Sequence, residues 1–204
     1  MEAHHIHPEL LKHKVRVLVV GCGGNGSAIA AGLPYLHQAL LAYGHPEGLH
    51  VTLLDADVIS PTNCVPQPFG RSEVGLYKSV VLANRLNLFW GLDWQGTPEQ
   101  LETKRRLDGV DILIGCVDTR AARATIAHCA EGSSELDYWL DLLPSFTVIL
   151  SAPSHRWEAA ASVLSRHSSF HHDLHWLRRA AASFFLLSQM VVPSLVNRTC
   201  DLKM

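Results

Sequence analysis

The 204-residue sequence lacks a cysteine framework, since its five cysteines are odd in number and none stands in a CxxC pair. This pattern is typical of free thiols in a reducing compartment, and it argues against a structural zinc site built from four cysteines. Residues 1–14 contain no apolar core of a secretory signal, and the longest apolar stretch, 180–196, is interrupted by serine, glutamine and proline. We therefore expect a cytoplasmic protein without a membrane partner.

Excess positive charge is also missing, because 17 Lys and Arg face 19 Asp and Glu for a net charge of −2. A protein that holds nucleic acid by charge would be far more basic, so we expect no nucleic-acid partner. The charge is uneven, with a net −5 over residues 1–142 and +3 over residues 143–204. Glycine is absent from the second segment. These differences divide the chain into a domain at 1–142 and an atypical tail at 143–204.

The first segment contains strand-like apolar runs that alternate with helical patterns. The runs predict strands at 15–20, 50–55, 110–116 and 138–142. The helical patterns fall at 25–42, 73–90, 99–107 and 119–130. The alternation predicts an α/β fold, with a Rossmann-like, doubly wound, mainly parallel sheet and helices on both faces.

A glycine-rich loop follows the first expected strand and opens a helix, with the sequence Gly21-Cys-Gly23-Gly24-Asn-Gly26. Glycine lets backbone N–H groups approach a phosphate closely, and the helix N-terminus supplies partial positive charge. Asp55, at the end of the second strand, is placed to accept hydrogen bonds from ribose hydroxyls. The pair indicates an adenine nucleotide without distinguishing ATP from NAD. Tight strand-to-helix packing with no ligand is the alternative.

Three further segments narrow this choice: Asp55-Ala-Asp57-Val58, then residues 62–69 followed by Gly75 and Lys78, then Cys116-Val-Asp118. In this combination the chain resembles the ThiF/MoeB and ubiquitin-activating family, whose pattern runs GxGGxG, DxDxV, SNLNRQxF, GxxK and CxD. The resemblance extends from about residue 15 to residue 141. Residues 63–79 and 84–92 look most like the ThiF-type proteins of the PRTRC plasmid-borne system.

The resemblance implies an ATP-dependent enzyme that adenylates the C-terminal carboxylate of a small ubiquitin-like protein and acts as a homodimer. A carboxylate that attacks a polyphosphate brings two anions together, so the step needs cations and a divalent metal. By resemblance, the glycine loop holds the phosphates, Asp55 holds the ribose, and further lining residues are Asp57, Asn63 and Gln67. The expected catalytic residues are Lys78, against the phosphates, and Asp118, the ligand of Mg²⁺. The alternatives are a solvated helix lysine and a helix N-cap.

Two departures from the family pattern put activity in question. Pro66 stands where the family has an arginine, and proline has neither charge nor donor for a phosphate oxygen. Arg71 is the candidate substitute, with a solvated loop arginine as the alternative. The resemblance implies a structural or a phosphate-binding role for Arg123, with a surface charge as the alternative. The tail lacks the family's Gly-rich continuation, so we expect it to be foreign to the fold, with an amphipathic helix at 173–187 as the alternative. A non-catalytic nucleotide-binding or adaptor protein and an NAD(P)-dependent oxidoreductase remain the alternative functions.

Overall fold

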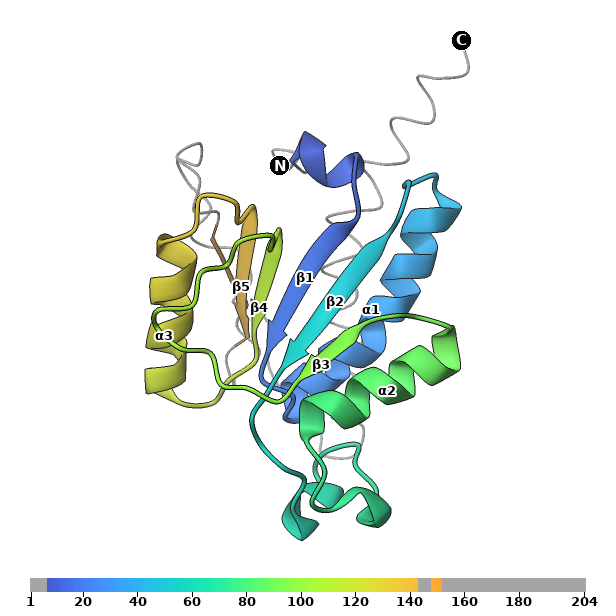
Figure 1. The fold of residues 1–204 in the computed structure, drawn as a ribbon, viewed down its shortest axis with the longest axis vertical. Helices are drawn as coiled ribbons and strands as arrows, with labels where there is room; N and C mark the ends of the chain where they lie inside the picture. The colour runs from blue at the N-terminus through green and yellow to red at the C-terminus, as the bar shows by residue number, and fades with distance from the viewer. Residues whose placement is uncertain (1–6, 143–147, 152–204) are drawn as a thin grey trace, which may run out of the picture.

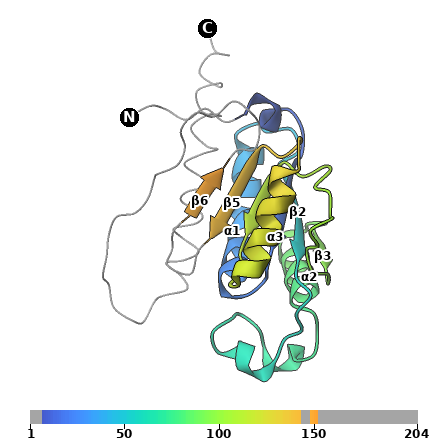
Figure 2. The ribbon, with the colours of Figure 1, turned by 90° about the vertical axis from the view of Figure 1, so that its left-hand side faces the viewer.

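Parallel pairing of the apolar runs builds the sheet at the centre of the protein. The computed structural model describes residues 7–142 and 148–151. Within these residues the sheet has six strands, in the order β3-β2-β1-β4-β5-β6; Figure 1 labels the first five and Figure 2 labels β6. The strands are β1 (Val15–Val20), β2 (Leu49–Leu54), β3 (Gln95–Thr97), β4 (Ile112–Gly115), β5 (Tyr138–Leu142) and β6 (Val148–Ser151). The first five pair in parallel, which confirms the predicted fold class.

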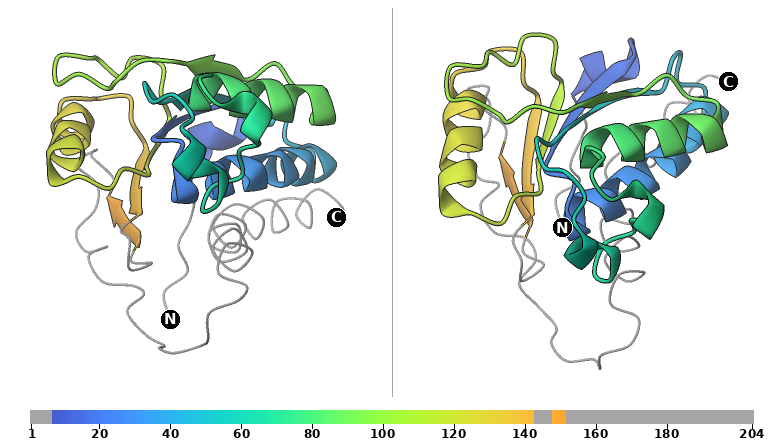
Figure 3. Two further views of the ribbon diagram at one scale, coloured as in Figure 1. Left: turned by 90° about the horizontal axis from the view of Figure 1, so that it is seen from below. Right: turned by 60° about the horizontal axis from the view of Figure 1, so that its bottom comes forward.

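Within the described residues, α-helices cover both faces of this sheet (Figure 3). They are α1 (Gly24–Ala42), α2 (Lys78–Trp90) and α3 (Arg120–Glu131). In one apolar core α1 and α2 pack with Val17 and Val19 of β1, and in a second core α3 packs with Leu18 and Val20. Because successive side chains of a strand point to opposite faces, one run of valine and leucine serves both cores.

Two predicted helices differ from those observed. The helix predicted at 73–90 begins at Lys78, because Arg71–Glu73 form a short 3-10 helix, η3, and Gly75 has a left-handed φ of +89°. The helix predicted at 99–107 is wrong, since this segment has one turn, at 103–104, and otherwise no helix or strand. Its buried leucines, Leu101 and Leu107, are six residues apart, a spacing that does not place them on one face of a helix. They hold the segment between β3 and β4 against the second core.

Two strands were not predicted. The short β3 lies against α2 so closely that a Cβ on Gly96 would come within 2.5 Å of the carbonyl oxygen of Ser79. The other, β6, pairs antiparallel with β5 at the edge of the sheet (Figure 2). The sheet thus continues beyond residue 142, where the sequence ended the nucleotide-binding domain. The possible helix at 173–187 and most of the tail lie outside the described residues.

Among the described residues, every helix is too short or too polar to cross a membrane.

Candidate functional site

The predicted site residues gather at the carboxyl edge of the sheet, where β1 and β4 diverge. After β1 the chain turns to α1 on one face, and after β4 it turns to α3 on the other. The two exits lie side by side, because the backbone N–H of Cys116 donates to the carbonyl oxygen of Val20 at 2.8 Å. Open α/β sheets bind their ligands outside the carboxyl ends of the strands at such a switch point.

Two glycines of the loop after β1 are required by close packing. Gly21 has φ +93°, and a Cβ there would lie 2.8 Å from the carbonyl oxygen of Cys116. A Cβ on Gly26 would overlap the carbonyl oxygen of Gly21. These two glycines therefore serve the junction of β1, α1 and β4, whether or not a ligand is present.

Gly23 differs from these two, because its outer side is open. It is the N-cap of α1, and its φ of −73° is not the left-handed conformation that favours glycine. A Cβ there would meet only Nε2 of Gln67, at 3.9 Å. No side chain caps the N-terminus of α1, a helix of 19 residues. Its free N–H groups could therefore bind an anion in the open space beside Gly23.

Asp55 is held in place by the two loops beside it. Its Oδ2 accepts from the backbone N–H of Cys22 at 2.5 Å, and its Oδ1 accepts from that of Asp57 at 2.8 Å. Ser79 donates its hydroxyl to the Asp55 carbonyl oxygen at 3.0 Å. Each carboxylate oxygen keeps a second lone pair, so the group can still accept a hydrogen bond from a ligand hydroxyl.

Lys78 is not a solvated helix lysine. It is the first residue of α2, its side chain is 7% exposed, and its Nζ lies 2.8 Å from Oδ2 of Asp57. Its backbone N–H also donates to the carbonyl oxygen of Asp57, at 3.0 Å. Asp57 itself is exposed, so the pair presents one buried cation and one solvated carboxylate beside Asp55. The arrangement fixes a positive charge near the glycine loop.

Asn63 and Gln67 occupy the loop between β2 and α2. Asn63 caps the start of the 3-10 helix η2 (Pro61–Cys64). Its Oδ1 accepts from the backbone N–H and the hydroxyl of Ser60, at 2.8 and 2.9 Å. Gln67 reaches toward Gly23, and its Oε1 is buried without a hydrogen-bond partner among the described residues. Of the two, Gln67 lies against the glycine loop, whereas Asn63 supports its own turn.

A clamp that the sequence did not predict holds the same loop. Arg85 of α2 donates to both carboxylate oxygens of Glu73, at 2.6 and 2.8 Å, and to the carbonyl oxygen of Pro68 at 2.7 Å. Pro66 and Arg71 lie on the exposed side of this loop. No hydrogen bond joins Arg71 to the glycine loop in the part of the chain that the structure describes, so the substitution suggested for Pro66 stays a prediction.

Asp118 is an exposed carboxylate on the loop after β4. Asp118 does not cap α3. The N-cap is Thr119, whose hydroxyl oxygen accepts from the backbone N–H of Ala122 at 3.2 Å. Within residues 7–142 and 148–151, the Asp118 carboxylate has no hydrogen-bond or ion-pair partner. A carboxylate oxygen is a hard ligand suited to Mg²⁺, which commonly binds to one or two carboxylates together with substrate phosphates.

The thiols at the site are not poised for chemistry. Cys22 and Cys116 are buried at the two strand exits. Burial raises the pKa of Cys116 to about 12 and also raises the pKa of Cys22, because a thiolate would be poorly solvated there. Both are therefore neutral thiols near pH 7, unlike a nucleophilic cysteine.

The cations near the N-terminus lie at the opposite edge of the sheet. Arg16 pairs with the buried Asp111 at 2.8 Å, Lys12 with Glu9 at 2.6 Å, and Lys14 with Glu47 at 3.8 Å. They flank the amino end of β1, about 20 Å along the strand from the glycine loop at 3.3 Å per residue. None of them serves the glycine loop of its own chain.

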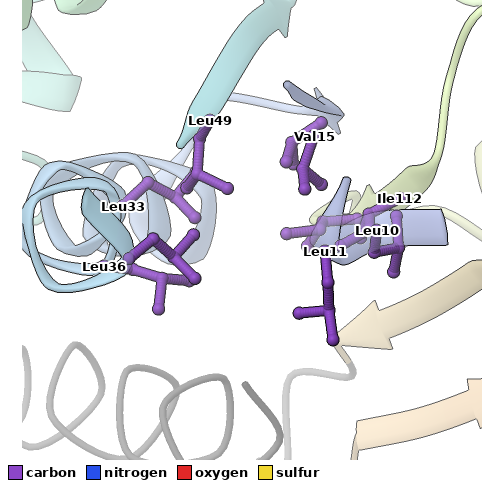
Figure 4. A pocket seen from close by; sticks show the side chains of 10 residues that line it. Leu10, Leu11, Val15, Leu33, Leu36, Leu49 and Ile112 are labelled. Atoms are coloured by element: carbon purple, nitrogen blue, oxygen red, sulfur yellow. The ribbon is translucent and has the colours of Figure 1, made fainter. Parts of the chain in front are cut away.

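An apolar pocket also lies toward the amino ends of the strands, between α1, the sheet and the 3-10 helix η1 (Pro8–Leu11) (Figure 4). Its walls are aliphatic side chains, among them Leu10, Leu33, Leu36, Leu49 and Ile112. With no charged or hydrogen-bonding side chain in its lining, the pocket offers nothing to a phosphate.

Asp141 is a second feature that was not predicted. It is a buried carboxylate at the carboxyl end of β5, its Oδ2 lies 3.9 Å from Nε of Arg123, and its Oδ1 has no described partner. Burial raises its pKa, and the nearby Arg123 opposes that shift. The signal was present in the sequence, since an aspartate within the apolar run Tyr-Trp-Leu-Asp-Leu-Leu is a charge that the fold must bury.

The fold and this edge of the sheet define a doubly wound α/β protein with the glycine-loop arrangement of nucleotide-binding proteins. Residues 9–137 match the model of the ThiF family, and the chain belongs to that family. The PRTRC subtype stays a prediction. No curated protein matches the chain.

Solved structures of E. coli tRNA N6-threonylcarbamoyladenosine dehydratase, TcdA, are similar to the chain. One has 25% identity and a TM-score of 0.46, over 62% of this chain and 51% of that one. A complex of TcdA with ATP has 28% identity and a TM-score of 0.42, over 56% and 46%. The chain spans about half the length of these structures.

Proposed function

We propose that the chain binds ATP with Mg²⁺ and adenylates the C-terminal carboxylate of a small ubiquitin-like protein. The observation that carries the proposal is the open side of Gly23 next to Cys22, which donates to the fixed carboxylate of Asp55. The buried cation Lys78 pairs with Asp57 beside that carboxylate. Membership of the ThiF family supports the same chemistry. The net charge of −5 over residues 1–142 favours a protein substrate over a nucleic acid.

Each group has a defined task in this proposal. Backbone N–H groups at the start of α1 hold the phosphates over Gly23, and Asp55 accepts hydrogen bonds from the ribose hydroxyls. Lys78, oriented by Asp57, offsets the negative charge of the phosphates. Asp118 would hold Mg²⁺, which lowers the repulsion between the incoming carboxylate and the phosphates. The partner's carboxylate oxygen forms a bond to the α-phosphorus, and pyrophosphate leaves.

Adenylation itself needs no thiol. The two thiols at the strand exits are not suited to a later thioester step, because burial keeps Cys22 and Cys116 protonated at neutral pH. Free buried thiols also agree with a cytoplasmic location. As the family resemblance implies, we propose that the active form is a homodimer, which light scattering of the purified protein tests.

Pro66 favours a second candidate, a nucleotide-binding protein without turnover. The residue lies exposed on the loop clamped by Arg85 and brings no donor to a phosphate. If Pro66 limits turnover, Pro66→Arg raises the exchange rate and ATP affinity. If Pro66 does not limit turnover, Pro66→Arg changes neither quantity. The exchange assay of the unsubstituted protein then shows whether the chain is active without this arginine or inactive for another reason.

The test is ATP–pyrophosphate exchange with small ubiquitin-like proteins as partners. We expect exchange that requires a partner with a free C-terminus, and none with the same partner carrying an amidated C-terminus. Lys78→Met is expected to abolish it. Saturable ATP binding without exchange for any partner would favour the non-catalytic candidate, and absence of ATP binding would contradict both.

A further inference from the structure

A connected set of contacts leads from β5 to the loop that carries Asp118. Arg123 lies one turn into α3 and folds back on this loop. Its Nε and Nη2 both donate to the carbonyl oxygen of Val117, at 3.3 and 3.0 Å. Because Val117 directly precedes Asp118, the guanidinium fixes the peptide on which the exposed carboxylate stands.

The same edge of the Arg123 guanidinium also lies near Asp141. The Nε of Arg123 lies 3.9 Å from Oδ2 of Asp141, and the two side chains are only 20% and 10% exposed. A charge pair so sheltered from water interacts more strongly than one on the surface. Asp141 thereby limits the orientations open to the guanidinium.

Gly115 makes room for this arrangement. It pairs with Asp141 in the register of β4 and β5, and a Cβ there would lie 3.2 Å from Oδ1 of Asp141. The Asp141 side chain therefore lies against β4, which ends one residue before Cys116 and three before Asp118. The backbone of β4 and the guanidinium of Arg123 are the two supports of the loop.

We propose that Arg123 and Asp141 are positioning residues that set Asp118 for the Mg²⁺ of a bound nucleotide. This inference rests on the proposed function only for the identity of the ligand. The positioning itself is carried by the two hydrogen bonds to Val117 and the sheltered pair behind them. Neither side chain need touch the nucleotide.

The first test compares ATP affinity with Mg²⁺ and with EDTA by calorimetry, on the full chain. The ratio of the two affinities reports the metal-dependent part of binding. We expect Arg123→Gln and Asp141→Asn to reduce this ratio about tenfold, because loss of a residue that orients a metal ligand commonly has an effect of that size. The ratio should approach the one measured for Asp118→Asn. Arg123→Lys, which keeps the charge but has no fork of donors, is expected to fall between.

The affinity in EDTA is expected to stay within about twofold, because the glycine loop and Asp55 are untouched in these variants. Arg106→Gln is the matched control, since Arg106 is 85% exposed and pairs with Asp108 away from the loop. A variant that lowers the melting temperature and leaves the Mg²⁺ ratio unchanged would show a merely structural role and overturn the proposal.

Hydrogen exchange of residues 116–123 in the ATP-free protein separates this proposal from the proposed function. Arg123→Gln and Asp141→Asn are expected to speed exchange there and to leave residues 49–54 of β2 unchanged. If the protein binds no ATP, the proposed function fails while the exchange result still decides whether the pair orders the loop. Unchanged exchange at 116–123 would overturn the positioning.

Discussion

The two halves of the candidate site differ in how far the protein pairs its own carboxylates. In the half built by β1, β2 and α2, Asp55 accepts two backbone hydrogen bonds and Asp57 pairs with Lys78. In the half built by β4, α3 and β5, the Asp118 carboxylate and Oδ1 of Asp141 have no partner among the described residues. One half has its carboxylates paired before a ligand arrives, and the other keeps carboxylate oxygens open.

The difference has a physical cause in the connections. In the loop after β1, Gly21 and Gly26 pack backbone against backbone, and one side chain, that of Asp55, bonds to the N–H of Cys22. The loop after β4 depends on side chains from α3 and β5 to hold it. In the proposed function, the first half would bind the phosphates and ribose of ATP, and the second would bind Mg²⁺.

The largest expected effect is in the first half. Gly26→Ala places a methyl group on the carbonyl oxygen of Gly21, so we expect a loss of about 3 kcal/mol or more in the free energy of unfolding. Gly44→Ala is the control, because Gly44 has φ +88° in open space and only backbone strain of about 1 kcal/mol applies. Urea denaturation measures both. Equal losses would contradict the close packing of the glycine loop.

Lys78→Met is expected to weaken ATP binding about 30-fold, the equivalent of about 2 kcal/mol for one charge-assisted hydrogen bond. Stability should change little, because the Asp57 left behind is 71% exposed and stays solvated. Lys104→Met removes the same charge from an exposed position in the segment between β3 and β4 and serves as the control. Calorimetry should show no difference between Lys104→Met and the unsubstituted chain. An affinity for ATP that survives Lys78→Met would remove Lys78 from the site.

Gly23→Ala tests whether the open side of Gly23 is needed for ATP binding or for stability. The added methyl group meets no protein atom closer than 3.9 Å, so the midpoint of urea denaturation should hardly move. The same methyl group occupies the open side assigned to the phosphates, and ATP affinity should fall about tenfold for the loss of one hydrogen bond. If stability falls and affinity does not, the open side of Gly23 is not a phosphate site.

The smallest effect is a pH dependence in the second half. Burial raises the pKa of Asp141 in the folded chain above its usual value of 3.8, so the folded state binds more protons than the unfolded state just above that pH. The contribution of this group to stability is complete below pH 3.8 and is lost as pH rises through the folded pKa. Asp141→Asn should therefore gain stability relative to the unsubstituted protein as pH rises from 4 to 7. A difference that is constant with pH would contradict a buried, titrating Asp141.

The sequence predicted the parts of the fold whose signals are local. The valine-rich run of β1, the glycine cluster and the carboxylate after β2 each carry their meaning within a few residues. The start of α2 was misplaced because Gly75 takes a left-handed conformation inside an otherwise helical pattern. The segment 99–107 was misread because its charged residues have helical spacing and its two buried leucines do not.

The candidate site was predictable to a similar extent. Asp55, Lys78 and Asp118 follow from motifs at the ends of strands and helices. The pairing of Arg123 with Asp141 could not be predicted, because it depends on the register of β4 against β5 and on the missing side chain of Gly115. Contacts of this kind join distant parts of the chain, so no periodic pattern in the sequence indicates them.

The most direct test of the central claim is calorimetric titration of the full chain with ATP and Mg²⁺ and, in parallel, with NAD. The account predicts saturable ATP binding that weakens in EDTA and in Lys78→Met, with no comparable binding of NAD. Tight binding of NAD without binding of ATP, or ATP binding indifferent to both Mg²⁺ and Lys78, would contradict it.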